Sequence, residues 1–257
     1  MLINSLNINP PKSEIFTLGP ISVHWYGLFL VLAIFLGLKL SFFWAKKYKI
    51  YQEKFWSLAF YLIILGFLGA RLYHVFSEFN YYQNRILAVF FIWQGGLGFY
   101  GALILGSIFL YFWARKNKIS FLAILDLIAP SLALGEIFVR LGNYFNQEIF
   151  SRSKHFFYQI VINFFIFVIL FLFSKRSVER IKNNQKFFFG QIFFIYLLLN
   201  SLFRFFFEFL RIDPQPIIFN LRLGQIVSIF LFFIGCLGLI YLKAKAKKLS
   251  YIFPKPQ

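Results

Sequence analysis

A short polar run, Arg140 to Glu148, separates two long apolar stretches of the chain. It carries a cation at Arg140, amides at Asn143 and Asn146, and a carboxylate at Glu148. The chain is 60% hydrophobic, and in an apolar medium an unpaired polar or charged group is costly, so such groups mark candidate functional sites. Because a guanidinium holds phosphate through paired hydrogen bonds, the run predicts a site for an anionic group.

The elements that must position this run are membrane helices. The hydrophobic share and the 41 Phe predict an all-α polytopic membrane protein, with residues 1–257 forming a single integral membrane domain. About 20 helical residues cross the hydrocarbon core. Charged breaks predict seven transmembrane helices, near 22–41, 56–76, 87–113, 121–139, 156–173, 187–207 and 222–242. The third is long, so we expect the glycine-rich stretch 95–101 to interrupt or bend it.

The net charge of +18 follows a pattern along the chain. Lysine and arginine gather after the first, third, fifth and seventh expected spans. By the positive-inside rule these connections are cytoplasmic, which places the N-terminus outside and the C-terminus in the cytoplasm. Residues 1–21 are then an extracytoplasmic segment, and 243–257 a basic cytoplasmic tail. Topology and attraction to anionic membrane lipids account for the basic excess, so no nucleic-acid partner is expected.

In this orientation, polar residues that topology does not explain collect toward the outer side. Arg204, Glu208 and Arg211 follow the spacing i, i+4, i+7, which puts them on one helical face. They could form an ordinary interfacial ion pair. Several arginines at one depth instead favour the head group of an anionic phospholipid. The other outer polar residues are Arg71 and His74 in the second span, and His24 and Tyr26 at the start of the first.

A glycine-rich stretch from Gly96 to Gly101 matches the dinucleotide pattern GxGxxG. That pattern needs a strand before it and a helix after it in a soluble βαβ unit, so the match is accidental. Two interpretations stay open: close helix packing or a broken span, and a backbone surface at Gly96 and Gly98 that a lipid head group approaches. Tyr100 is either an interfacial aromatic residue or a hydroxyl directed at the site.

The histidines and the single cysteine offer little metal or thiol chemistry. His24 is either an interfacial anchor or a catalytic group, His74 could pair with Glu78, and His155 lies in a polar stretch. No HExxH or comparable spacing supports a metal, and no cofactor is expected. Cys236 lies in an apolar span and has no partner for a disulfide within the chain. Any reacting thiol must therefore come from another molecule.

Several motifs resemble those of the prolipoprotein diacylglyceryl transferase family of bacterial inner membranes. The run from Val139 to Glu148 is similar to the family pattern G-R-x-G-N-F-x-N-x-E. The resemblance extends from about residue 18 to residue 242, with the motifs in the family's order. The further matching segments are Ile21 to Leu28, Gly69 to Arg71, Gly95 to Gly101 (GGL-x-F-(H/Y)-G), Asp126 and Pro130 (D-x-x-A-P), Arg204 with Glu208 and Arg211, and Gly224 with Gln225.

This resemblance implies an activity. Members transfer the diacylglyceryl group of phosphatidylglycerol to the lipobox cysteine thiol of a preprolipoprotein, forming a thioether and releasing glycerol phosphate. The implied partners are phosphatidylglycerol, preprolipoprotein signal peptides and membrane lipids. The implied location is the bacterial inner membrane, with the active site toward the extracytoplasmic side. The chemistry needs a base for the incoming thiol and cations for the departing phosphate.

The motif matches also imply residue roles. Arg140 is the first candidate for the phosphate, with Arg204 and Arg211 as a gate or second phosphate contacts. The expected catalytic residues are Arg140, Tyr100, Tyr26, His24 and Arg211. The expected head-group-binding residues are Arg140, Asn143, Asn146, Glu148, Arg204, Glu208, Arg71, Gly96 and Gly98.

The chain departs from the family pattern in three places. Val139 replaces a glycine, and Tyr100 stands where many members carry a histidine proposed as the base. Because a phenol is a poor base at neutral pH, His24 or Glu148 could take that role. The segment between Glu148 and His155 is short, and the family's H-P-S-Q-L-Y-E motif is altered there. A lipid-binding paralogue with weak or no activity, and a transporter with an outward polar cavity, are therefore the alternatives.

Overall fold

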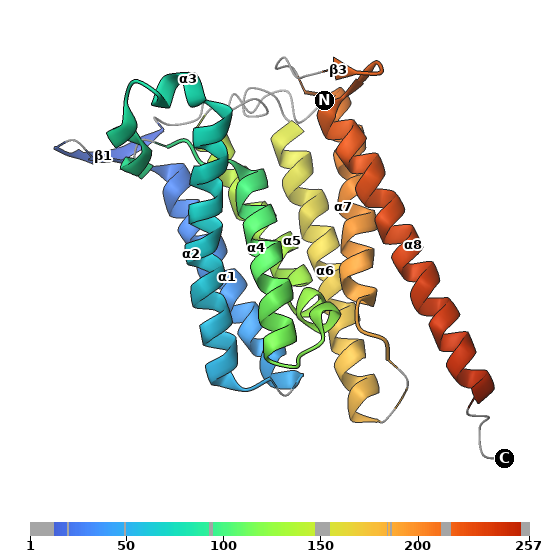
Figure 1. The fold of residues 1–257 in the computed structure, drawn as a ribbon. Helices are drawn as coiled ribbons and strands as arrows, with labels where there is room; N and C mark the ends of the chain where they lie inside the picture. The colour runs from blue at the N-terminus through green and yellow to red at the C-terminus, as the bar shows by residue number, and fades with distance from the viewer. Residues whose placement is uncertain are drawn as a thin grey trace. The chain divides into compact units, whose positions relative to one another are not determined.

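A computed structural model describes residues 13–19, 21–48, 50–92, 95–146, 155–183, 185, 187–211 and 217–252. The chain is mostly helical, with two short β-hairpins in addition (Figure 1). Glu148 lies outside the described residues. The all-α prediction therefore describes most of the chain but omitted the hairpins.

Six of the described helices are long and apolar enough to cross a membrane. Each corresponds to one of the seven spans expected from the charged breaks. The apolar runs are thus sufficient to locate these helices, although all six end beyond the expected bounds, and α1, α7 and α8 begin inside them. They are α1 (Trp25–Lys47), α2 (Gln52–Ser77), α5 (Phe121–Phe145), α6 (His155–Lys182), α7 (Gln191–Phe209) and α8 (Leu223–Ile252).

The third expected span, 87–113, was placed wrongly at its start. Its helix is α4 (Phe99–Lys116), which is not among the six. The preceding residues form α3 (Phe79–Tyr82), the short 3-10 helix η2 (Ile86–Phe90) and a glycine-containing loop. Gly95 and Gly96 have φ of +89° and +76°, a left-handed conformation that an α-helix cannot contain. The glycine-rich stretch therefore interrupts the expected span, one of the two predicted effects, and α4 begins within the stretch at Phe99.

The chain divides into two compact units. The first comprises residues 1–41 and 125–257, and the second comprises residues 42–124. In the first unit α7 packs along α8 and against α6, and in the second α2 packs along α4 (Figure 1). The sequence had predicted one integral domain, 1–257, without this subdivision.

The two hairpins belong to the first unit and each precedes a long helix. Strand β1 (Glu14–Leu18) pairs antiparallel with β2 (Ile21–His24), directly before α1. Strand β3 (Ile217–Ile218) pairs with β4 (Leu221–Arg222), directly before α8. The hairpins therefore set the positions at which α1 and α8 begin.

A buried carboxylate joins α5 to the start of α7. The side chain of Asp126 on α5 is fully buried, and its two oxygens accept hydrogen bonds from the backbone N–H groups of Gly190 (2.6 Å) and Phe193 (2.8 Å). The first N–H groups of a helix have no partner within the helix, so this carboxylate serves as their cap from another helix. Asp126 thereby fixes the start of α7 against α5, next to the core formed by α5, α6 and α7.

In the second unit, glycines allow α2 and α4 to approach each other closely. A Cβ atom added at Gly69 would collide with the backbone oxygen of Gly101, and one added at Gly101 would collide with that of Gly69. The N–H of Gly98 also donates to the carbonyl of Ala70 on α2 (2.9 Å). Of the two interpretations of the glycine-rich stretch, helix packing is the one that these contacts support.

The Asp126 cap yields a stability prediction. Asp126→Ala leaves the buried N–H of Gly190 and the part-buried N–H of Phe193 without an acceptor, and an unsatisfied buried donor costs about 1–3 kcal/mol. Asp126→Asn retains one oxygen acceptor and should lose less. Thermal unfolding of the detergent-solubilised protein should rank wild type above Asn and Asn above Ala. Glu179→Gln, which removes an exposed carboxylate on α6, is the control; an equal effect from it would contradict the capping role.

Candidate functional site

A polar cavity lies within the first unit. Its volume is about 180 Å³, room for several water molecules or a small polar group. Helices α5, α6 and α7 supply its walls, together with the residues just after α7. A polar cavity among apolar helices is the expected form of a binding site for a polar ligand. The lining residues are Glu136, Arg140, Asn143, Gln159, Asn163, Asn200, Phe203, Arg204, Phe207, Glu208 and Arg211.

Three arginines converge on this cavity. Arg140 comes from α5, Arg204 from α7, and Arg211 from the segment after α7. The charges of Arg204 and Arg211 both act on Arg140. Only two carboxylates, Glu136 and Glu208, oppose these three cations among the described lining residues. The cavity therefore carries an excess of positive charge that attracts an anion.

The carboxylate of Glu136 is held by α7. The hydroxyl of Tyr196 donates to its Oε1 atom (2.7 Å), and the Asn200 amide donates to the same oxygen. The Asn200 amide is also 2.9 Å from the Tyr196 oxygen. Glu136 lies one turn before Arg140 on α5 and acts on it electrostatically. This network therefore places a fixed negative charge beside Arg140.

A buried acceptor faces the cavity from α6. Gln159 lines the cavity and is 5% exposed, yet its Oε1 atom has no hydrogen-bond partner among the described residues. Buried hydrogen-bond acceptors nearly always have a donor. An acceptor that lines a cavity without a donor therefore indicates that a bound molecule supplies one. A ligand hydroxyl would supply such a donor. Asn163, one turn further along α6, adds a second buried amide to the same wall.

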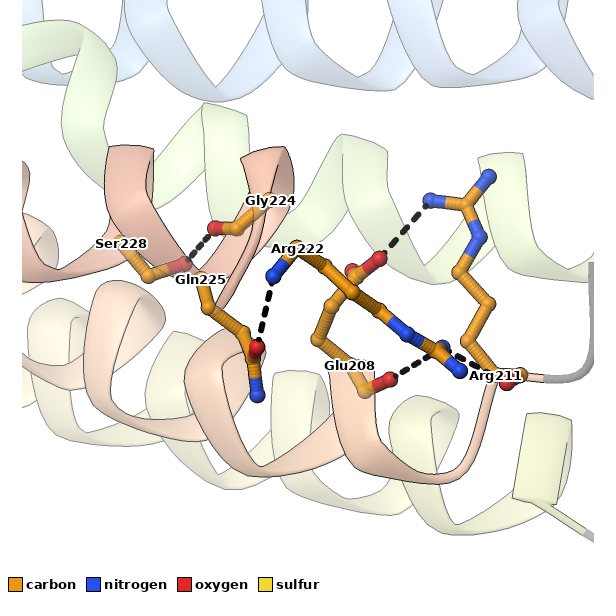
Figure 2. Close-up of polar contacts among 6 residues, drawn as sticks. All are labelled: Glu208, Arg211, Arg222, Gly224, Gln225 and Ser228. Carbon is orange, nitrogen blue, oxygen red and sulfur yellow. Dashed lines mark hydrogen bonds and ion pairs between the residues drawn. The ribbon is translucent and has the colours of Figure 1, made fainter. Parts of the chain in front are cut away.

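Hydrogen bonds join the C-terminal end of α7 to the start of α8 (Figure 2). Glu208 and Arg211 form an ion pair at 3.4 Å. The guanidinium of Arg222, in β4, donates to the backbone carbonyls of Glu208 (2.7 Å) and Arg211 (2.6 Å). A Cβ atom at Gly224 would lie 2.7 Å from a carboxylate oxygen of Glu208, so only glycine leaves room for this side chain. These contacts keep Glu208 and Arg211 at the edge of the cavity.

The other predicted residues of the first unit have varied positions. Asn143 lines the cavity, whereas Asn146 follows the end of α5 and is not among the described lining residues. Tyr26 packs against Gly142, where a Cβ atom would lie 2.9 Å from its ring. His24 ends strand β2, where it pairs with Glu14, and it is also absent from the described lining.

Arg71 belongs to the second unit and uses its guanidinium to hold a loop. Its nitrogens donate to the backbone carbonyls of Val89 (2.8 Å), Gly95 (2.7 Å) and Gly96 (3.0 Å), and further to those of Ala88 and Phe91. The side chain is buried. In this conformation Arg71 therefore stabilises the loop that precedes α4, while its expected contact with a head group stays a prediction.

The predicted residues Gly96, Gly98 and Tyr100 belong to the second unit, as Arg71 does. A Cβ atom at Gly96 would lie 2.5 Å from the ring of His74, and one at Gly98 would collide with the ring of Tyr73. Side chains of α2 therefore cover both glycines. Tyr100 is in the first turn of α4, with its ring 6.1 Å from that of Tyr73.

Sequence reasoning missed several residues of the cavity. All are polar residues inside spans that were taken as apolar, and this is the signal that would have found them. The missed residues are Glu136, Gln159, Asn163, Tyr196 and Asn200, together with Arg222 next to the cavity.

In the described part of the chain, His, Cys, Asp and Glu form no group of three or more that could hold a metal ion.

Comparison with known proteins places the chain in a family. The family model for prolipoprotein diacylglyceryl transferase matches residues 13–241. A phosphatidylglycerol–prolipoprotein diacylglyceryl transferase of Parasynechococcus marenigrum is 33% identical, covering 93% of this chain and 96% of the relative. Enzymes of the same name from Synechocystis (32%; 93% and 92%) and Halalkalibacterium halodurans (30%; 95% and 90%) are also similar. The chain belongs to the prolipoprotein diacylglyceryl transferase family.

Proposed function

We propose that this protein transfers the diacylglyceryl group of phosphatidylglycerol to the lipobox cysteine thiol of a preprolipoprotein. Family membership supports this reaction, and the relatives' names state both the lipid and the protein substrate. The observation that carries the proposal is the convergence of Arg140, Arg204 and Arg211 on one polar cavity among apolar helices. Such a cavity suits the phosphate of a lipid head group.

In the reaction, the cysteine sulfur forms a bond to the diacylglyceryl carbon that carries the phosphate ester. The carbon–oxygen bond breaks, glycerol phosphate leaves with the electron pair, and the thiol proton passes to a base. Negative charge grows on the leaving oxygen, which the guanidinium groups of Arg140, Arg204 and Arg211 stabilise. The single cysteine, Cys236, is in α8 and is not among the described cavity residues. The nucleophile is the substrate's thiol.

The head group's two ends match two parts of the cavity. Its phosphate pairs with the arginines, and its glycerol hydroxyls donate to the open oxygen of Gln159 and pair with the neighbouring amide of Asn163. Asn143 and Asn146, with Glu148, orient the head group or Arg140. Tyr26, which packs against Gly142 on the same helix as Arg140, supplies a hydroxyl. The base is Tyr100, His24 or Glu148, the candidates that the motifs indicate.

The proposed orientation places this chemistry on the extracytoplasmic side of the bacterial inner membrane. In this topology α4 crosses the membrane in addition to the six other long helices, the N-terminus lies outside, and the C-terminus is cytoplasmic. The basic connections between spans support it by the positive-inside rule. Helices α5 and α7 end near the cavity and α6 begins near it, so the site lies at the end of the helices opposite the basic loops.

Arg140→Ala should abolish transfer. Removal of one group that stabilises charge in a transition state typically lowers the rate by about 100-fold or more. The assay is thioether labelling of a lipoprotein in cells depleted of their own transferase and supplied with this chain. Arg180→Ala, which removes an exposed arginine of α6, is the control. If well-inserted wild type gives no labelling, the chain is a non-catalytic paralogue; if Arg140→Ala keeps full activity, its phosphate role is wrong.

A comparison of Glu136→Ala with Glu136→Gln distinguishes the hydrogen bonds by which Glu136 orients Arg140 from the effect of its negative charge. Gln keeps an oxygen acceptor for Tyr196 and Asn200, whereas Ala removes it. If Glu136 orients Arg140 through this network, Ala should lower kcat by about 10-fold and Gln by much less. Steady-state kinetics with phosphatidylglycerol vesicles and a lipobox peptide give this comparison. Equal losses for Gln and Ala would show that the negative charge, and not the network, is what matters.

Gln159→Leu should raise KM for phosphatidylglycerol by about 10-fold with a smaller change in kcat. The leucine removes the acceptor for a head-group hydroxyl while keeping the side chain's size, and a lost hydrogen bond of this kind costs about 1–2 kcal/mol. The same kinetic assay measures it. Gln185→Leu, at an exposed position outside the cavity, is the matched control. A change confined to kcat would contradict the binding role.

A further inference from the structure

The second unit contains a groove that the proposed transfer does not use. It lies between the first turns of α2 and the last turns of α4, and its volume is about 590 Å³. It is lined mainly by apolar surface, with two lysines among its residues. No residue of the proposed catalytic set contributes to it. Its occupant can be inferred from the chemistry of its floor and its rim.

The floor of the groove is aromatic. Trp113 on α4 is buried at 8% exposure, and Phe109, one turn earlier, is half-buried. Tyr61 on α2 and Phe112 on α4 form the more exposed sides. In a bilayer such a surface contacts lipid chains, and aromatic side chains with a polar edge favour the level of the head groups.

The rim of the groove is cationic. Lys54 on α2 and Lys116 on α4 both line it. The Lys54 ammonium makes one long hydrogen bond, 3.5 Å, to the carbonyl of Asn117, which leaves two of its three donors for a ligand. Glu53 is the one acidic residue among the described lining, and in the described part of the chain no ion pair joins it to either lysine. Within the described part of the chain, neither ammonium group is therefore neutralised by an ion pair.

The surroundings of the groove add to this charge. Lys46 and Lys47 end α1, and Arg115 and Lys118 lie beside Lys116 at the end of α4, all within the second unit. A basic cluster of this size at the end of membrane helices attracts anionic lipid, at about 1 kcal/mol for each Lys or Arg near the surface. The charge thus selects the anionic lipids of the leaflet at this end of the helices.

We propose that this groove binds one anionic phospholipid. The ammonium groups of Lys54 and Lys116 hold its phosphate, and its acyl chain lies along Phe109 and Trp113. In the proposed orientation, this lipid belongs to the cytoplasmic leaflet. The groove is distinct from the polar cavity of the first unit, because the two share none of their described lining residues. Its function is to anchor α2 and α4 at the inner surface of the membrane.

Quenching of tryptophan fluorescence tests this site in the full-length protein. The protein is placed in phosphatidylcholine nanodiscs that contain a minor fraction of phosphatidylserine, an anionic lipid that is not the proposed substrate. Bromine atoms on the acyl chains of either lipid quench nearby tryptophan. Because Trp113 forms the floor, brominated phosphatidylserine should quench at least about 3-fold more than brominated phosphatidylcholine at the same mole fraction. The excess should disappear in Trp113→Phe.

Charge variants separate the groove from the general attraction of a basic surface. The double variant Lys54→Gln/Lys116→Gln should lose the excess quenching. The control Lys175→Gln/Lys182→Gln removes the same charge from exposed positions on α6 and should keep it. Native mass spectrometry should show one fewer retained phosphatidylserine in the groove variant alone. Equal quenching by the two lipids, or equal loss in both double variants, would overturn the proposal, whatever the outcome of the transferase assay.

Discussion

Lipid offers no water to the polar groups of a spanning helix, so each buried carboxylate, amide or guanidinium needs a partner within the protein. This constraint explains much of the structure. Asp126 satisfies the first N–H groups of α7, and Arg71 satisfies the carbonyls of the loop before α4. Arg222 does the same for the carbonyls at the end of α7. Each polar side chain thereby joins two segments that are separate in sequence.

The polar cavity of the first unit is the place where this internal pairing is incomplete. Its arginines outnumber its carboxylates, and the buried oxygen of Gln159 lacks a hydrogen-bond partner among the described residues. The pairs that do exist, Glu136 with Tyr196 and Glu208 with Arg211, set the positions of the side chains without cancelling the positive charge. An anion with hydroxyl groups supplies both the missing negative charge and the missing hydrogen-bond donor, which is why a phosphatidylglycerol head group suits the cavity.

Much of the fold could be predicted from the apolar runs because a membrane helix needs only length and hydrophobicity. The start of α4 could not, since the left-handed backbone at Gly95 and Gly96 ends the helical pattern in a stretch that still looks hydrophobic. The β-hairpins were missed because the strands are only two to five residues long. Within the site, Arg140, Arg204 and Arg211 were predicted from charge and motif, whereas Glu136 and Gln159 were hidden within apolar spans.

By itself, the sequence determined the class of protein and the approximate positions of six spans, because hydrophobicity acts over whole segments. It could not separate arginines of different purpose. Arg71 lies within an expected span and Arg140 directly after one, and both match family motifs. Yet Arg71 donates its hydrogen bonds to a backbone loop, whereas Arg140 lines the cavity. Only the tertiary structure decided this, because a guanidinium's role depends on which acceptors surround it in space.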